Sequence, residues 1–230
     1  MTTSSVALPV KTKGRSATAP DGIEVSKTIE GLQVVNNPDV ALAIWRRSLP
    51  AHLRVWLDRL DPSELPDVRL LVRPADLHRA LQPLLDEAGM PNGPMRDLLV
   101  GDISTLVQLF ADIVRTDLID VRFERISHDA CWKFHRDCVD ARLLTTYRGA
   151  TSEWVHPSDS EAAISQQKSF LGPIQRLAAD DVAIFLGSCA GPGTGIVHRS
   201  PPVAGTGETR LLLCLNKPSV TSPDQWPAPA

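Results

Sequence analysis

The sequence of 230 residues predicts an α+β protein: a helical N-terminal part packed on a C-terminal antiparallel β-sandwich or barrel. Two observations predict this class. From about Pro38 to Leu118, apolar residues recur every three to four positions, as on the buried stripe of amphipathic helices. From Asp120 onward, they alternate with polar residues or form short runs between Gly- and Pro-rich turns, which is typical of short antiparallel strands.

The composition is that of an ordinary globular protein, with 43% hydrophobic and 22% charged residues. The net charge is -3 and the basic residues are scattered, so we expect no nucleic-acid partner. No apolar stretch reaches the roughly 18 residues of a membrane span. We therefore expect a soluble, cytoplasmic protein without a membrane partner. The sequence does not indicate an oligomeric state.

Four parts are expected along the chain. Residues 1–25, rich in Ser, Thr and Ala, are expected to be a disordered leader, with a transit peptide as the alternative. Residues 26–118 should form the mainly helical part, and residues 119–217 the β-rich part, in one compact unit with the helices. The Pro-rich tail, residues 218–230, should be an extended cover or disordered.

Helices are expected wherever the three-to-four periodicity is continuous. Pro residues near the start and Gly89 after the third segment are typical helix start and stop signals. The last segment has the widest apolar stripe. The expected helical segments are residues 38–45, 51–60, 74–85 and 97–118.

Strands are expected where the period changes to two or where short apolar runs are bounded by turn residues. Pro201 and Pro202 should end the fourth of them, because proline cannot donate to a strand ladder. The expected strands are residues 120–126, 143–147, 181–186, 195–198 and 210–215.

Two histidines and one aspartate form the most informative pattern. His135 and Asp137 lie two residues apart, so in an extended segment their side chains point to the same side. His198 ends a Gly-rich, apolar segment and should arrive from a different strand. Two His and one carboxylate can cap one face of an iron(II) ion and leave the other face open. The pattern predicts a catalytic metal site formed by His135, Asp137 and His198; in the alternative, Asp137 simply pairs with Arg136 or Arg142.

An arginine near this group would hold the carboxylate of a co-substrate through two parallel hydrogen bonds. Arg210 begins the strand that follows His198, and Arg142 and Arg199 compete for the same role. Tyr147, the chain's single tyrosine, lies on an expected barrel strand and can donate a hydrogen bond to a bound acid. The alternative for Tyr147 is a core residue with a satisfied hydroxyl.

Four segments carry a resemblance to a known family: Cys131–Asp137 (CWKFHRD), Arg142–Trp154 (RLLTTYRGATSEW), Asp180–Gly187 (DDVAIFLG) and His198–Pro202 (HRSPP). They resemble the bacterial family catalogued as domain of unknown function 1826, which brings no function with it. Its motif order is similar to that of double-stranded β-helix oxygenases that use iron(II) and 2-oxoglutarate. This wider resemblance implies a jelly-roll, cupin-like β-part, with iron on the two histidines and the aspartate and the distal carboxylate of 2-oxoglutarate on Arg210.

The leading hypothesis is an iron(II)/2-oxoglutarate-dependent oxygenase that uses O2 to oxidise a C–H bond of an unknown small molecule. One alternative is a zinc- or iron-binding barrel without oxygenase activity, for instance in metal homeostasis, with Cys131 and Cys138 joining His135 in a zinc site. Another is a non-catalytic barrel that binds a small molecule. The four cysteines form no C-x-x-C pair and are expected to be free thiols.

Overall fold

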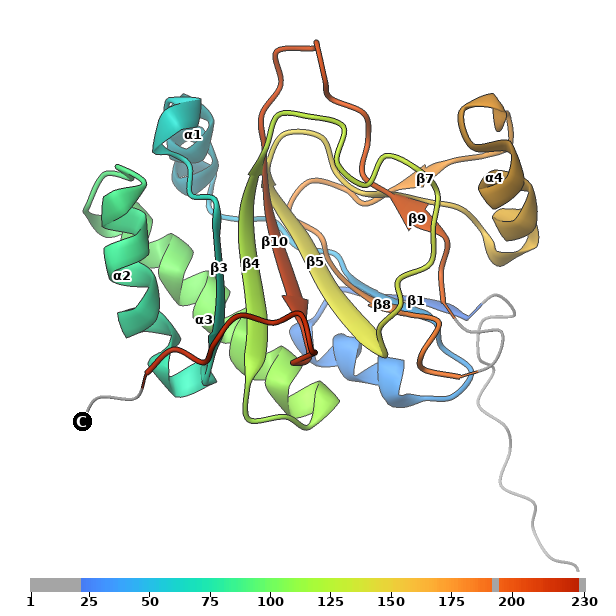
Figure 1. The fold of residues 1–230 in the computed structure, drawn as a ribbon, viewed down its shortest axis with the longest axis horizontal. Coiled ribbons are helices and arrows are strands. Elements are labelled where there is room, and N and C mark those ends of the chain that lie inside the picture. Colours follow the sequence, from blue (N-terminus) through green and yellow to red (C-terminus); the bar gives the residue numbers. More distant parts are fainter. Residues whose placement is uncertain (1–21, 192–194, 228–230) are drawn as a thin grey trace, which may run out of the picture.

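The computed structural model describes residues 22–191 and 195–227, which form an α+β fold with two sheets (Figure 1). The large sheet has the strand order β1-β2-β8-β5-β10-β4-β3, and the small sheet has the order β7-β6-β9. The large sheet comprises β1 (Ile23–Ser26), β2 (Leu42–Trp45), β3 (Val68–Val72), β4 (Ile119–Ile126), β5 (Ala141–Arg148), β8 (Val182–Leu186) and β10 (Arg210–Asn216). The small sheet comprises β6 (Glu153–Trp154), β7 (Gln175–Arg176) and β9 (His198–Arg199).

The helices lie on both outer sides of this pair of sheets. Helices α1 to α3 gather beside the large sheet, and α4 lies at the opposite end of the molecule, beyond the small sheet (Figure 1). The α-helices are α1 (Ala51–Arg59), α2 (Leu77–Glu87), α3 (Pro94–Val114) and α4 (Ser160–Gln166). Short 3-10 helices span Ile29–Asn36, Pro62–Glu64, Pro74–Asp76, Pro157–Asp159 and Gln167–Ser169.

Alternation along β10 explains the layers. Leu211, Leu213 and Leu215 pack into the core shared with α1, α2 and α3. Leu212 and Cys214 point to the other face and belong to a second core, between the two sheets. Burying each leucine stabilises the fold by about 1.5–3 kcal/mol. The large sheet is therefore buried on both faces along β10. One face packs against the helices, and the other faces the small sheet.

The expectation of helix over residues 38–45 is wrong, because Leu42–Trp45 is strand β2, paired with β1 on one side and β8 on the other. A short apolar run is compatible with the helical period of 3.6 and with the strand period of two. Here the chain is a strand because its backbone pairs with a neighbour on each edge. Strands β1 and β3 were also not expected. Strand β1 begins at Ile23, inside the expected leader, whose residues 1–21 lie outside the described part. The division into four parts stays a prediction.

The other expected elements overlap the observed ones, although the strand expected at residues 195–198 shares only His198 with β9. Helix α3 ends at Val114, four residues before the expected end, because Arg115 adopts a left-handed conformation (φ 53°). Strand β9 ends at Arg199, before the two prolines, as expected. Strand β6, strand β7 and helix α4 had no expectation attached, because two-residue strands leave no periodic signal.

The C-terminal tail covers an edge of the large sheet over the part described. The backbone N–H of Trp226 donates to the carbonyl of Leu71 at 2.7 Å, and the Trp226 side chain packs against the helix-side core. The Ser222 hydroxyl donates to Asp120 at 2.7 Å. Of the expected tail, residues 218–230, the described part up to residue 227 thus contacts β3 and β4. Among the described residues, no helix has the length and apolar character required to cross a bilayer.

Candidate metal centre

His135, Asp137 and His198 come together between the two sheets. One ligand atom from each lies within 4.8 Å of the others. The backbones of His135 and His198 exchange two hydrogen bonds of 3.0 Å, so the segment that carries His135 lies beside β9. The carboxylate of Asp137 lies 3.5 Å from His135 Nε2 and 3.2 Å from His198 Nε2. Asp137 and His198 are buried, and His135 is partly exposed.

The local structure turns these side chains inward. The side-chain amide of Gln167 bonds both the N–H and the carbonyl of Phe134, in the way that a neighbouring strand would. The carbonyl of Asp137 accepts from the backbone and the hydroxyl of Ser188. Arg136, between the two ligands, points out to Glu161 of α4 at 3.0 Å. The segment is thus held extended, with His135 and Asp137 on one side.

Both imidazoles present Nε2 to the site. His135 Nδ1 lies 2.7 Å from the carbonyl of Lys133, and His198 Nδ1 lies 3.0 Å from the carbonyl of Ile196. A carbonyl can only accept, so each Nδ1 carries the proton and, in a neutral imidazole, Nε2 keeps its lone pair. The His198 ring also packs against Phe185 of β8, with centroids 4.8 Å apart. These contacts fix the ring orientation that a metal ligand requires.

The surroundings of Asp137 favour its ionised form. Burial opposes the ionisation of Asp137, but hydrogen bonds from His135 and His198 and the charges of His198 and Arg142 outweigh it, and the pKa of Asp137 lies well below its usual range. The hydrogen bond to Asp137 raises the pKa of His135 against the effect of burial. The imidazoles can donate to Asp137 only when doubly protonated; when neutral, their lone pairs face its oxygens.

This donor set fits a metal ion. Asp137 Oδ2 is buried, and His198 Nε2, 3.2 Å away, can donate to it only as part of a doubly protonated ring; with neutral imidazoles, a cation would satisfy this oxygen together with both Nε2 lone pairs. Ligand bonds of about 2.1 Å place neighbouring ligand atoms about 3 Å apart, close to the 3.5 and 3.2 Å that separate the Asp137 carboxylate from the two histidines. Two imidazoles and one carboxylate suit iron(II) with open positions. The group contains no cysteine, so the zinc site with Cys131 and Cys138, both exposed, gains no support.

A cavity of about 140 Å³ opens beside this group, between β4, β5 and β10 of the large sheet and β9 of the small one. His135 and His198 line one side. The opposite wall combines Leu144, Leu212 and Cys214 with charged residues of the same sheet face, Arg122, Glu124 and Arg142. The wall opposite the histidines is therefore partly apolar and carries two arginines and one glutamate.

Arg210 lies fully buried at the start of β10, close to this cavity. Its Nε donates to the carbonyl of Ala150 at 2.6 Å and its Nη1 to the hydroxyl of Ser200 at 2.9 Å. Its Nη2 is buried without a partner among the described residues. Burial lowers the pKa of Arg210 to about 10, against the attraction of Glu124 and Glu153. A bound carboxylate would supply the missing partner.

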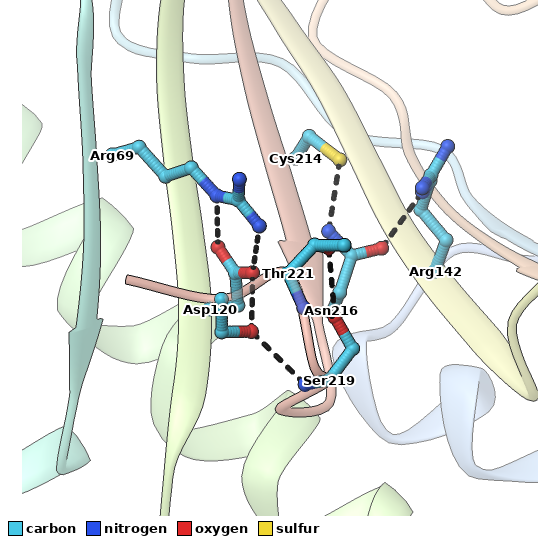
Figure 2. Close-up of polar contacts among 8 residues, drawn as sticks. Arg69, Asp120, Arg142, Cys214, Asn216, Ser219 and Thr221 are labelled. Carbon is cyan, nitrogen blue, oxygen red and sulfur yellow. Dashed lines mark hydrogen bonds and ion pairs between the residues drawn. The ribbon is translucent and has the colours of Figure 1, made fainter. Parts of the chain in front are cut away.

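The two competing arginines are already engaged. Arg142 donates to Asp137 at 2.5 Å and to Asn216 at 2.8 Å; Figure 2 shows the contact with Asn216. Asp137 thus pairs with Arg142, as one reading of the sequence expected, while still facing the histidines. Arg199 donates to Glu153 at 2.7 Å and lies over the Phe134 ring. Of these three arginines, Arg210 is the one with a fully buried guanidinium nitrogen that lacks a partner among the described residues.

The expectation that Tyr147 contacts a bound acid is wrong. Tyr147 sits on the helix side of β5, because alternation puts it on the face opposite to Arg142. Its hydroxyl donates to Asp102 of α3 at 2.5 Å, and Arg47 binds the same carboxylate. The other reading, a core tyrosine with a satisfied hydroxyl, is the correct one.

Sequence reasoning missed Arg122, Glu124 and Ser200. Arg122 and Glu124 lie on β4 and face the cavity, and Ser200 orients Arg210. A signal was present for the first two: the apolar residues of β4 alternate with charged ones, and a strand covered on both faces by other elements needs a reason to carry charges there.

An α+β protein with a His-Asp-His group between two sheets is the class that this geometry defines. The profile of the family described as "Protein of unknown function (DUF1826)" matches residues 26–216, and the chain belongs to this family. No curated protein matches the chain in sequence.

Several solved structures are similar to this one. A prolyl-4-hydroxylase from Pseudomonas putida is 12% identical, with a TM-score of 0.42, over 82% of this chain and 93% of that one. HygX from Streptomyces hygroscopicus, solved with nickel and 2-oxoglutarate bound, is 12% identical, with a TM-score of 0.42, over 85% and 88%. The Kdo hydroxylase KdoO, described as a non-heme Fe(II) alphaketoglutarate-dependent dioxygenase, is 12% identical, with a TM-score of 0.39, over 81% of each chain.

Proposed function

We propose that this protein is an iron(II)/2-oxoglutarate-dependent oxygenase that acts on a small molecule. The observation that carries the proposal is the convergence of His135, Asp137 and His198, whose ligand atoms lie within 4.8 Å of one another. The buried guanidinium of Arg210, with one nitrogen unpaired, adds a partner for a carboxylate on a separate strand. Iron(II) and an acidic co-substrate use these two kinds of group.

The strand order supports the same assignment. Eight extended segments follow one another from β4 to β10, with the His135 segment as the second. Four of them lie in the large sheet, in the order β8-β5-β10-β4, and the other four in the small sheet, where the His135 segment continues β7-β6-β9. This is the arrangement of a double-stranded β-helix, or jelly roll, and we propose that fold for the β-rich part.

Each residue then has a distinct task. When bound, iron(II) with 2-oxoglutarate and O2 would supply oxidation of a C–H bond, coupled to decarboxylation of 2-oxoglutarate to succinate. His135, Asp137 and His198 would hold the metal on one side. Arg210, oriented by Ser200, would hold the distal carboxylate of 2-oxoglutarate. Leu144, Leu212 and Phe185 form the apolar surroundings that keep water from the site.

The test is a His198→Ala variant. We expect it to lose iron(II) binding and the formation of succinate from 2-oxoglutarate that proceeds slowly even without substrate. The matched control is His52→Ala, on the exposed side of α1, which should behave like the wild-type protein. Succinate formation at the wild-type rate in His198→Ala would contradict the assignment. Metal analysis that finds tightly bound zinc and no turnover would favour the barrel without oxygenase activity.

A further inference from the structure

Arg122 is the charged group of the cavity that the metal centre does not explain. It lies on β4 and lines the cavity together with His135 and His198. Its Nε is buried and has no hydrogen-bond partner among the described residues. Arg122 as a whole is partly exposed, but its Nε–H is enclosed, and a buried N–H without a partner is costly because its desolvation is not compensated.

The acidic neighbours of Arg122 do not neutralise it. Asp120, two residues earlier on the same face, accepts from Arg69 at 3.0 and 2.6 Å and from Ser222 at 2.7 Å. Figure 2 shows the two contacts between Arg69 and Asp120. Glu124, two residues later, makes no ion pair with Arg122 in the described structure. Both carboxylates are thus close enough to attract Arg122 but do not bond it.

The neighbours across the sheet add no negative charge. Cys214 of β10 lies directly opposite Arg122, and burial raises the pKa of its thiol to about 11, so it is neutral. On the other side, Arg69 of β3 lies directly opposite Arg122. Like charges in directly opposite positions destabilise a sheet. Asp120 offsets the charge of Arg69, and an anion bound at Arg122 would offset the charge of Arg122 and pair its Nε–H.

The site at Arg122 is separate from that at Arg210. Arg210 and Cys214, the residue opposite Arg122, are four residues apart on β10, which is about 13 Å of strand. Ala150 and Ser200 hold the Arg210 guanidinium at its own end of the strand. The four carbon–carbon bonds of 2-oxoglutarate, about 1.5 Å each, cannot exceed about 6 Å. The backbone positions of the two arginines thus differ by more than the length of one 2-oxoglutarate, and we assign a separate anionic group to each.

We propose that Arg122 binds an oxyanion of the substrate, a carboxylate or a phosphate, next to the His135–Asp137–His198 group. The substrate class is thus a small organic acid or phosphate ester. The anion site itself rests on Arg122 and its neighbours; only its assignment to the oxidised substrate rests on the proposed function.

The test uses inorganic phosphate and acetate as probes, titrated calorimetrically into the full chain saturated with iron(II) and 2-oxoglutarate without oxygen. We expect Arg122→Gln to weaken binding of one probe or both by about tenfold to a hundredfold, since a charge-assisted bond is lost. The stronger probe tells carboxylate from phosphate. Arg122→Lys should restore part of the affinity. Arg125→Gln, on the same strand and bonded to Pro62 and Ser63, is the matched control and should bind as wild type does.

Two outcomes would overturn the inference. One is unchanged probe binding in an Arg122→Gln variant that unfolds at the wild-type temperature. The other is a tenfold loss of 2-oxoglutarate affinity in that variant, because Arg122 would then serve the co-substrate. If the wild-type protein binds no 2-oxoglutarate, the proposed function fails, but the same titrations on the metal-free protein still decide whether Arg122 holds an anion.

Discussion

At the scale of single residues, the metal centre depends on His135 and Asp137 lying on one side of an extended segment. His135 and Asp137 could be paired because residues two apart in an extended segment share a side, and the structure brings His198 to them. The same alternation along β5 puts Tyr147 on the face opposite to Arg142, away from the metal centre. Choosing among three arginines was beyond the sequence, since their difference lies in partners from distant segments, Glu153, Asn216 and Ser200.

Replacing Arg210 by Gln should raise the dissociation constant of 2-oxoglutarate by about tenfold to a hundredfold while iron(II) binding stays intact. The reason is that a bidentate charged partner of the carboxylate is lost. Anaerobic titration of the iron(II)-loaded protein measures both. Arg210 is fully buried, so its loss could also affect folding. Arg210→Lys therefore serves as a second variant, which keeps the positive charge but lacks the two parallel N–H donors of the guanidinium. Wild-type affinity in both variants would exclude Arg210 from this role.

Replacing Tyr147 by Phe should lower the free energy of unfolding by about 1–2 kcal/mol, because one hydrogen bond to the Asp102 carboxylate is lost while Arg47 still binds it. Chemical denaturation measures the change. Affinity for 2-oxoglutarate should not change, since the hydroxyl lies on the helix side of the sheet. A selective loss of co-substrate affinity would return Tyr147 to the site.

At the scale of elements, long periodic segments were predictable and short ones were not. The expected helices at 51–60 and 97–118 and the strands of the β-rich part correspond to α1, α3, β4, β5, β8 and β10. The four apolar residues of strand β2 fit the helical and the strand period equally, and the strand is defined by its pairing with β1 and β8 on its two sides. The sequence did not distinguish an extended cover from a disordered tail, because the contacts of the tail, such as Ser222 with Asp120, join residues that are distant in sequence.

The contact between the tail and β4 should make stability depend on pH through Asp120. Burial opposes its ionisation, but bonds from Arg69 and Ser222 outweigh this and lower its pKa from the ordinary 3.8. A carboxyl with a lowered pKa in the folded state binds fewer protons there than in the unfolded chain. Its contribution is thus complete well above pH 3.8 and is lost as pH falls through the folded-state pKa.

The corresponding variant is Asp120→Asn. At pH 7 we expect it to unfold with about 1–3 kcal/mol less free energy than the wild type, because charge-assisted bonds are lost. The difference should shrink as pH falls below about 4, where the carboxyl group is protonated first in the unfolded chain and then, at lower pH, in the folded protein. Urea denaturation at several pH values measures this. Asp97→Asn, on the first turn of α3, is a control; a difference that stays constant down to pH 2 would contradict the account.

At the scale of the whole molecule, two sheets and a shared cavity bring together residues from four separate segments. The arrangement joins the His135 segment, β9, β4 and β10, which no local pattern connects. Family membership covers residues 26–216 and thus both the helices and the sheets. The sequence predicted the α+β class because periods differ between its halves; it could not show that three N-terminal strands complete the large sheet.

Metal binding should stabilise the whole molecule. A ligand that binds only the folded state adds about 2.7 kcal/mol to the free energy of unfolding when its free concentration is 100 times its dissociation constant. We therefore expect iron(II), added without oxygen, to raise the unfolding temperature of the wild-type protein, and a chelator to reverse this. The shift should be absent in His198→Ala and preserved in His52→Ala. An equal shift in both variants would place the metal elsewhere.

The central claim is that His135, Asp137 and His198 hold an iron(II) ion that also binds 2-oxoglutarate. The most direct measurement is the visible absorption spectrum during anaerobic addition of iron(II) and then 2-oxoglutarate. The account predicts a charge-transfer band of the iron(II)–2-oxoglutarate chelate in the wild-type protein and its absence in a folded Asp137→Ala variant. No band in the wild-type protein, or an equal band in Asp137→Ala, would contradict it.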